Sequence, residues 1–288
     1  MFEPNPIQAR LLMAVQNLAA ENQHLIDRSR AAGDHELTPT AQAHLHLGRR
    51  TQESFEAVAT AVGVPQSVLA YTAASGQRGH RWQPGQPLLS TEEIARDTLL
   101  AGHRAAVGQL QEMAGIGAAL AHQEPLSRAG FAAFRRVMGY RWQQVGAVGH
   151  ALALTTPERQ RAWEPTDTAW TTTVARTVGG LHRSDLVARW RAIVDTESYL
   201  SIPVRVLRDA GISLDDISRQ LPVPPDRMVE LTAAALQQTS SFGEAAGGDI
   251  GAAIEVTGTE LQTEPETGDH TTAPEGGGRD GRDVGPDP

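Results

Sequence analysis

Apolar residues recur every three to four positions along most of this chain, and this spacing is the strongest constraint on its fold. Residues 5–30 show it clearly, at Ile7, Leu11, Val15, Leu18 and Leu25. A period near 3.6 places apolar side chains on one side of an α-helix. We therefore expect an amphipathic helix here. Its apolar side either packs against the rest of the chain or forms the seam of a dimer.

Further helices are expected where the same spacing lies between start and stop signals. Ser90 and Glu93 have the spacing of a capping box, which predicts the start of a long helix. Other helices are predicted over 124–139, closed by Gly139, and over 167–180 and 183–195. The best β-branched run, WTTTVARTV at 170–178, lies between helical segments. The fold class predicted is all-α.

The composition excludes several classes of enzyme. The chain has no cysteine, and all 25 of its Lys+Arg residues are arginine. Thiol nucleophiles, Walker A lysines and Schiff-base lysines are therefore impossible. No G-x-S-x-G motif is present, and the chain shows no catalytic constellation. We predict that the protein is not an enzyme and uses no cofactor.

Metal binding and membrane insertion are also not expected. His44 and His46 lie two residues apart, so a helix would point them to different sides. The first residues, MFEPNPIQAR, lack a basic region followed by an apolar run. The longest apolar stretch, AGIGAALA at 114–121, is too short to cross a bilayer. These features favour a cytoplasmic protein without a metal site.

The negative charge of the chain is concentrated in residues 240–288. This segment holds eleven acidic residues and only two arginines, which together account for the whole net charge of −9. It also contains eleven glycines and has no aromatic residue after Phe242. Such a composition cannot bury enough apolar surface to offset the entropy of ordering. We expect an acidic, disordered tail.

Residues 52–72, QESFEAVATAVGVPQSVLAYT, have the pattern of two helices that meet at a tight turn. Ala59 is the small residue that a close helix crossing requires, Gly63 can make the turn, and Val64 and Leu69 can seal the second helix. This stretch resembles the helix-turn-helix of bacterial transcription regulators. The resemblance implies that the residues facing the DNA major groove are Pro65, Gln66, Ser67, Ala70 and Tyr71, flanked by Arg78 and Arg81.

A second candidate unit covers residues 141–163. Trp142, Val145 and Gly146 resemble the W-x-x-I-G opening of some helix-turn-helix proteins, and Thr156 can cap a second helix. Residues 126–163 hold six arginines and one acid, which makes them the most basic part of the chain. The DNA contacts predicted here are Arg135, Arg136, Arg141, Arg159, Gln160 and Arg161.

Residues 207–231 form a third candidate unit, but its charge is wrong for DNA. Ser218 takes the small position, Pro222 the turn and Val223 the apolar plug. Three arginines face five acids over this stretch. Binding to phosphate depends on positive side chains that displace counterions, so this unit is expected to keep the fold without the DNA contact.

These patterns predict an organisation in five segments. They are an amphipathic helix (1–35), a helix-turn-helix-like unit (36–88), a long helix with a basic unit (89–165), a helical segment with an acidic unit (166–239) and the tail (240–288). The predicted function is that of a DNA-binding regulator whose partner is duplex DNA. The sequence also allows a homodimer or a protein partner. The alternative is a helical interaction or scaffold protein that does not bind nucleic acid.

Overall fold

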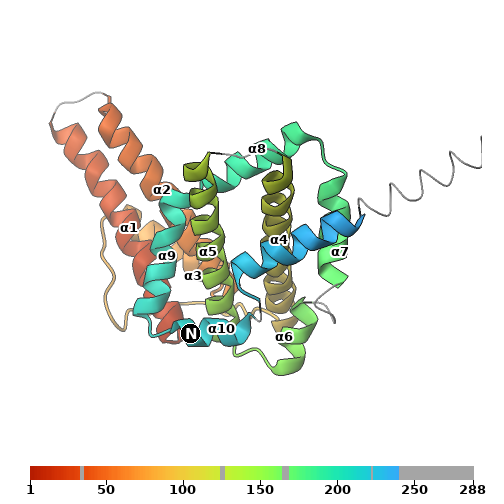
Figure 1. The fold of residues 1–288 in the computed structure, drawn as a ribbon. Coiled ribbons are helices and arrows are strands. Elements are labelled where there is room, and N and C mark those ends of the chain that lie inside the picture. Colours follow the sequence, from red (N-terminus) through yellow and green to blue (C-terminus); the bar gives the residue numbers. More distant parts are fainter. Residues whose placement is uncertain (33–35, 124–126, 164–168, 222, 240–288) are drawn as a thin grey trace, which may run out of the picture. The chain divides into compact units, whose positions relative to one another are not determined.

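Helices make up the fold wherever the structure describes the chain (Figure 1). The computed structural model describes residues 1–32, 36–123, 127–163, 169–221 and 223–239. All of these lie in the first of the two units, Met1–Gly243 and Glu244–Pro288, into which the chain divides. These described ranges contain helices α1 to α10, a further helix over 225–239 and no strand, which confirms the all-α prediction for them. The predicted disordered tail lies outside them.

The first three helices pack on one another around α1. They are α1 (Pro6–Ala31), α2 (Pro39–Ala61) and α3 (Gln66–Gln77). A capping box begins α1, because Asn5 Oδ1 accepts a hydrogen bond from the Gln8 backbone N–H at 2.9 Å and the Gln8 side chain accepts one from Asn5 N–H. Leu11 and Val15 are fully buried among residues of α2 and α3. The apolar face of α1 therefore packs within the body.

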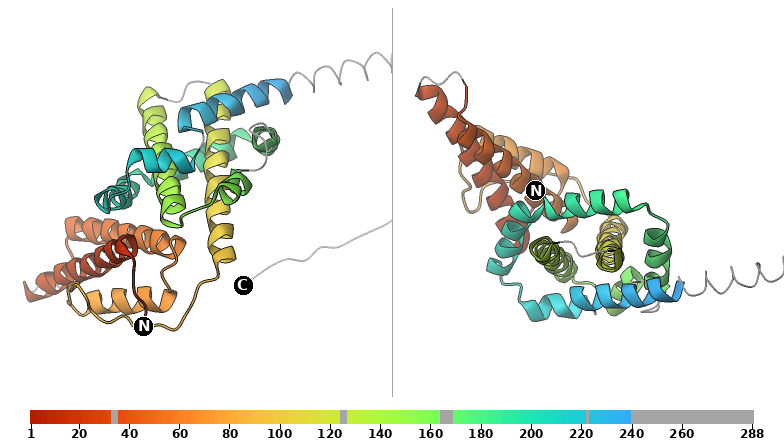
Figure 2. Two further views of the ribbon diagram at one scale, coloured as in Figure 1. Left: turned by 90° about the horizontal axis from the view of Figure 1, so that it is seen from below. Right: turned by 45° about the horizontal axis from the view of Figure 1, so that its top comes forward.

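Helices α4 (Arg96–Gln123) and α5 (Arg128–Ala151) lie side by side, with the later helices around them. The surrounding helices are α6 (Thr156–Trp163), α7 (Ala169–Gly179), α8 (Arg183–Val194), α9 (Glu197–Asp209), α10 (Leu214–Gln220) and the helix over 225–239. The right view of Figure 2 shows α4 and α5 nearly end-on between these neighbours. A second core fills this part, with Phe134, Val137, Trp170 and Met228 among its buried residues.

The capping box predicted at Ser90 and Glu93 does not form. Residues 90–95 are not helical, and α4 begins at Arg96. The Ser90 hydroxyl and the Glu92 carboxylate are engaged by Ser67 at the start of α3 instead. The contact between Ser67 and Glu92, which are 25 residues apart, thus takes the place of the predicted capping box.

The prediction that Gly139 closes a helix is also wrong. Helix α5 continues for twelve residues beyond it, to Ala151. Buried apolar residues recur with helical spacing on both sides of Gly139, at Val137, Val145 and Val148. Packing of this continuous apolar face outweighs the propensity cost of one glycine, which is about 1 kcal/mol.

Candidate functional site

The junction between α2 and α3 has the local geometry that the first unit requires. Gly63 has a φ of +86°, in the left-handed region that glycine adopts without a steric penalty. Val64 and Ala59 are fully buried, and Leu69 is almost so. The Gln8 side-chain amide donates to Val62 O at 2.9 Å, which fixes the turn to α1. Helix α3 starts three residues after Gly63.

Helix α3 turns one side to solvent and the other to α1. Gln66, Ser67, Ala70 and Tyr71 are exposed, with Tyr71 retaining 49% of its surface. Pro65 is buried, so it is not available to face DNA as the resemblance implied. The exposed side of α3 therefore carries the predicted reading residues except Pro65.

Two arginines lie beyond the C-terminal end of α3. Arg78 is the residue that caps α3, and Arg81 follows three positions later. Both side chains are exposed, and neither makes an ion pair with a described carboxylate. The last turn of α3 thus presents positive charge that nothing in the described part of the chain neutralises.

An acidic side chain lies at the opposite end of α3. Ser67 donates from its backbone N–H and from its hydroxyl to Glu92 Oε2, at 3.3 and 3.0 Å, and its hydroxyl lies 2.9 Å from that of Ser90. Free N–H groups at a helix N-terminus favour an anion. Glu92 therefore occupies the position where a phosphate oxygen would be most favourable. No local pattern in the sequence pointed to this contact.

In the second unit, Arg135 and Arg136 are held by carboxylates from other helices. Arg135 donates to both oxygens of Asp226, at 3.0 and 2.7 Å, and Arg136 donates to both oxygens of Glu197. In each case the hydrogen bonds to the carboxylate raise the pKa of the guanidinium. These two arginines are exposed but neutralised by their partners.

The other predicted residues of the second unit lie apart from these. Arg159 and Arg161 donate to Leu154 O and Pro157 O, within the turn before α6 and its first residues, while Gln160 is exposed. Helix α6 follows the C-terminal end of α5, about 24 Å along the helix axis from Arg135 at 1.5 Å per residue. The structure does not gather these arginines on one face.

Arg141 is the exception, because it points into the protein. Its side chain is half-buried and donates a hydrogen bond from Nη1 to Gln144 Oε1 at 3.1 Å. Burial lowers the pKa of this guanidinium. Arg141 lines a cavity between α4 and α5, so it is not placed to contact duplex DNA.

The third unit uses its acids for internal contacts. Asp216 forms a capping box with Ser213 at the start of α10, and Asp226 pairs with Arg135. Ser218 is exposed, which contradicts its predicted place at a close helix crossing. The close crossing lies one residue earlier, where a Cβ on Gly146 of α5 would come within 2.5 Å of Ile217 Cγ2.

Metal binding, membrane insertion and similarity to known proteins give no further indication of function. The described residues contain no group of three His, Cys, Asp or Glu side chains that could hold a metal ion. Among the described helices, none has both the length and the apolar content needed to cross a membrane. Comparison with protein-family models, with curated proteins and with solved structures finds no match to this chain.

Proposed function

We propose that the protein binds duplex DNA through the exposed side of α3. Gln66 and Tyr71 would contact base edges or sugars, and Arg78 and Arg81 the phosphate backbone, while Ser67 is held by Glu92. The observation that carries the proposal is the pairing state of the arginines. Arg78 and Arg81 have no carboxylate partner among the described residues, whereas Arg135 and Arg136 each have one.

The proposed DNA contact lies in the helix-turn-helix-like unit at 36–88 and not in the basic unit that follows it. The arginines of the second unit are the more numerous, but Arg135 and Arg136 would have to break bidentate ion pairs before they could bind phosphate. Breaking such an ion pair costs free energy, which offsets part of the free energy gained from a new contact with phosphate. The net contribution of these arginines to DNA binding is therefore small. Arg159 and Arg161 retain guanidinium N–H groups that make no hydrogen bond within the described part of the chain, so they would be secondary contacts with DNA.

A salt-titrated binding assay tests the proposal. A fluorescent duplex of mixed sequence is titrated with the full chain at several salt concentrations, and binding is followed by anisotropy. The variant R78Q/R81Q is compared with R135Q/R136Q, which removes the same charge from paired positions. Loss of two phosphate contacts should make the negative slope of log K against log salt concentration shallower by about 1.8. This change is expected in R78Q/R81Q only. Equal slopes for the two variants would contradict the assignment, and no binding at low salt would reject the function.

A protein partner is the second candidate for the same surface. Two large side chains that face solvent support it, because Tyr71 is 49% and Leu89 is 78% exposed. Leu89 adjoins Ser90, whose hydroxyl contacts Ser67 of α3. The variant E92Q discriminates the candidates. Removing this negative charge from the start of α3 should tighten DNA binding, whereas a contact through Tyr71 and Leu89 would be little changed.

A further inference from the structure

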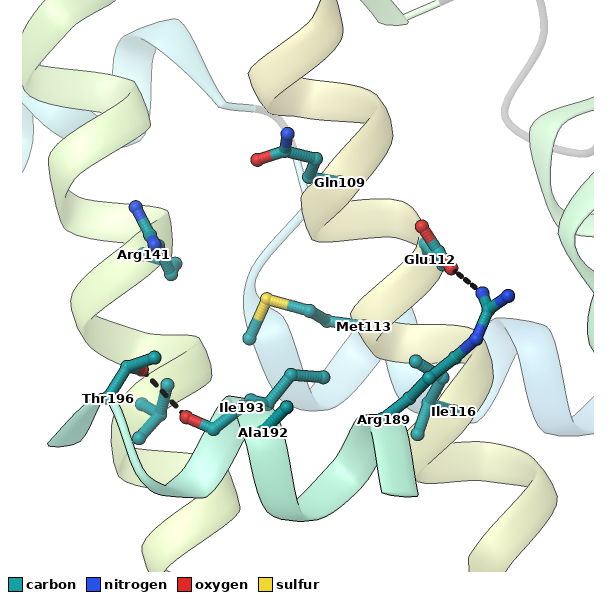
Figure 3. Close-up of a pocket in the computed structure, with 10 residues that line it drawn as sticks. Gln109, Glu112, Met113, Ile116, Arg141, Arg189, Ala192, Ile193 and Thr196 are labelled. Carbon is teal, nitrogen blue, oxygen red and sulfur yellow. Dashed lines mark hydrogen bonds and ion pairs between the residues drawn. The ribbon is translucent and has the colours of Figure 1, made fainter. Parts of the chain in front are cut away.

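A cavity lies between α4, α5 and α8, separate from the α3 surface. Its volume is about 390 Å³, within the range of small-molecule sites. Figure 3 shows Met113 and Gln109 of α4 on one side, Arg141 of α5 on the other, and Ala192 and Ile193 of α8 along a third. Gln109 and Ala192 are exposed, so the cavity opens to solvent between them.

The walls of this cavity are mostly apolar, with charge at two places. Met113, Ile116, Val137 and Ile193 supply the apolar surface. Glu112 at one edge forms an ion pair with Arg189 of α8, so these two charges neutralise each other. The remaining charge in the lining is that of Arg141.

Arg141 makes few hydrogen bonds for a half-buried cation. A guanidinium has five N–H donors, and the single hydrogen bond to Gln144 Oε1 uses one of them. No carboxylate among the described residues forms an ion pair with it. The other N–H donors of this half-buried guanidinium make no hydrogen bond within the described part of the chain, so they are available to an anion that enters the cavity.

A second observation comes from the neighbouring cavity. This inner cavity, of about 160 Å³, shares Gln109, Met113 and Arg141 with the first and is also lined by His103. His103 is only 3% exposed, and its Nδ1 atom has no hydrogen-bond partner within the described part of the chain. Buried polar atoms in proteins are nearly always paired, so an unpaired one beside a cavity marks a place for a polar group.

We propose that the cavity between α4, α5 and α8 binds a small amphipathic monoanion, with its carboxylate on Arg141 and its apolar body against Met113, Ile116, Val137 and Ile193. The guanidinium fork matches a carboxylate and can donate two hydrogen bonds to it. A single negative group is expected, because Glu112 and Arg189 pair with each other and leave Arg141 as the remaining charge of the lining. This site is independent of DNA binding by α3.

The test uses 8-anilinonaphthalene-1-sulfonate, a fluorescent aromatic monoanion, as the probe on the full chain. Decanoate and decanol then compete for the site, since they share one apolar chain and differ in the negative charge. Because a carboxylate can form a bidentate ion pair with the guanidinium and a hydroxyl cannot, decanoate should displace the probe at a concentration at least about tenfold lower than decanol. Equal displacement by the two would overturn the role of Arg141.

Variants give the second arm of the test. R141M should weaken binding of probe and decanoate at least about tenfold, and R128M, which removes an exposed arginine of the same helix, should leave both unchanged. If R141M does not fold, A192W keeps Arg141 and fills the mouth of the cavity, so it should abolish probe binding. Unaltered binding in R141M or in A192W would overturn the proposal. The proposal would also be overturned if a peptide of residues 248–256 displaced the probe more strongly than decanoate does. The cavity would then bind a segment of the chain itself.

Discussion

The packing of α3 on α1 depends on a glycine, and replacing it should loosen the proposed DNA-binding helix. A Cβ added at Gly76 would lie 2.3 Å from Gln16 O and 2.6 Å from Ala19 Cβ, both on α1. A backbone oxygen cannot rotate away as a side chain can. The variant G76A therefore forces α1 and α3 apart over their whole contact.

The size of the effect follows from two opposing contributions. Alanine in a helix is favoured over glycine by about 1 kcal/mol. Overpacking a buried contact costs about 1–3 kcal/mol, and contact with a backbone atom places Gly76 at the upper end of that range. We expect a net destabilisation of about 1–2 kcal/mol. A chain of this size would then melt roughly 2–8 °C lower.

G139A is the matched control, since Gly139 lies inside α5 and an added Cβ would meet nothing within 4 Å. It should stabilise the protein by about 0.5–1 kcal/mol through helix propensity alone. Urea unfolding followed by circular dichroism measures both variants. If G76A is as stable as the wild type, the close crossing of α1 and α3 does not exist. If G139A is destabilised, α5 is not continuous through residue 139.

Three further predictions concern the turn, the buried histidine and the tail. G63A should lower the stability by about 1–2 kcal/mol, because alanine is strained at the φ of +86°, and an unchanged melting temperature would refute this turn. Burial lowers the pKa of His103 to about 4, below its ordinary value of 6.5. The unfolded chain therefore binds the proton more readily, so stability should fall from pH 6.5 down to about pH 4. H103Q should lessen this fall in urea titrations across that range, and parallel curves would contradict it. Deleting residues 240–288 should tighten binding to duplex DNA, more so at low salt, because eleven acids no longer compete with phosphate. Equal affinity of both chains at low salt would rule out such competition.

Much of the helical architecture could be predicted because it depends on local spacing. The apolar period over 5–30 matches α1, and the segments 167–180 and 183–195 contain α7 and α8. The turn at Gly63 was also predictable, since only a residue tolerant of positive φ fits between two helices so close in sequence. These features need no knowledge of distant parts of the chain.

Features that depend on tertiary contacts could not be predicted in this way. Whether Gly139 ends a helix depends on the apolar face that continues to Val148, and this face is buried by later helices. Whether Ser90 and Glu93 begin a helix depends on Ser67, which engages the side chains of Ser90 and Glu92. Local signals were present in both cases, and a longer-range contact outweighed them.

The three helix-turn-helix-like units differ in how far their charged side chains are neutralised by ion pairs. Counting charged residues along the sequence does not reveal this pairing. Two of the six arginines of 126–163, Arg135 and Arg136, are neutralised by acids that lie 91 and 61 residues away. The acidic start of the helix over 225–239 is explained in part in the same way, because Asp226 is the partner of Arg135. Part of the positive charge of the second unit is therefore compensated within the body. Among the described arginines that form no ion pair, Arg78 and Arg81 lie at the end of α3 and the half-buried Arg141 lines the cavity, so their positive charge is placed to attract a ligand from outside the chain.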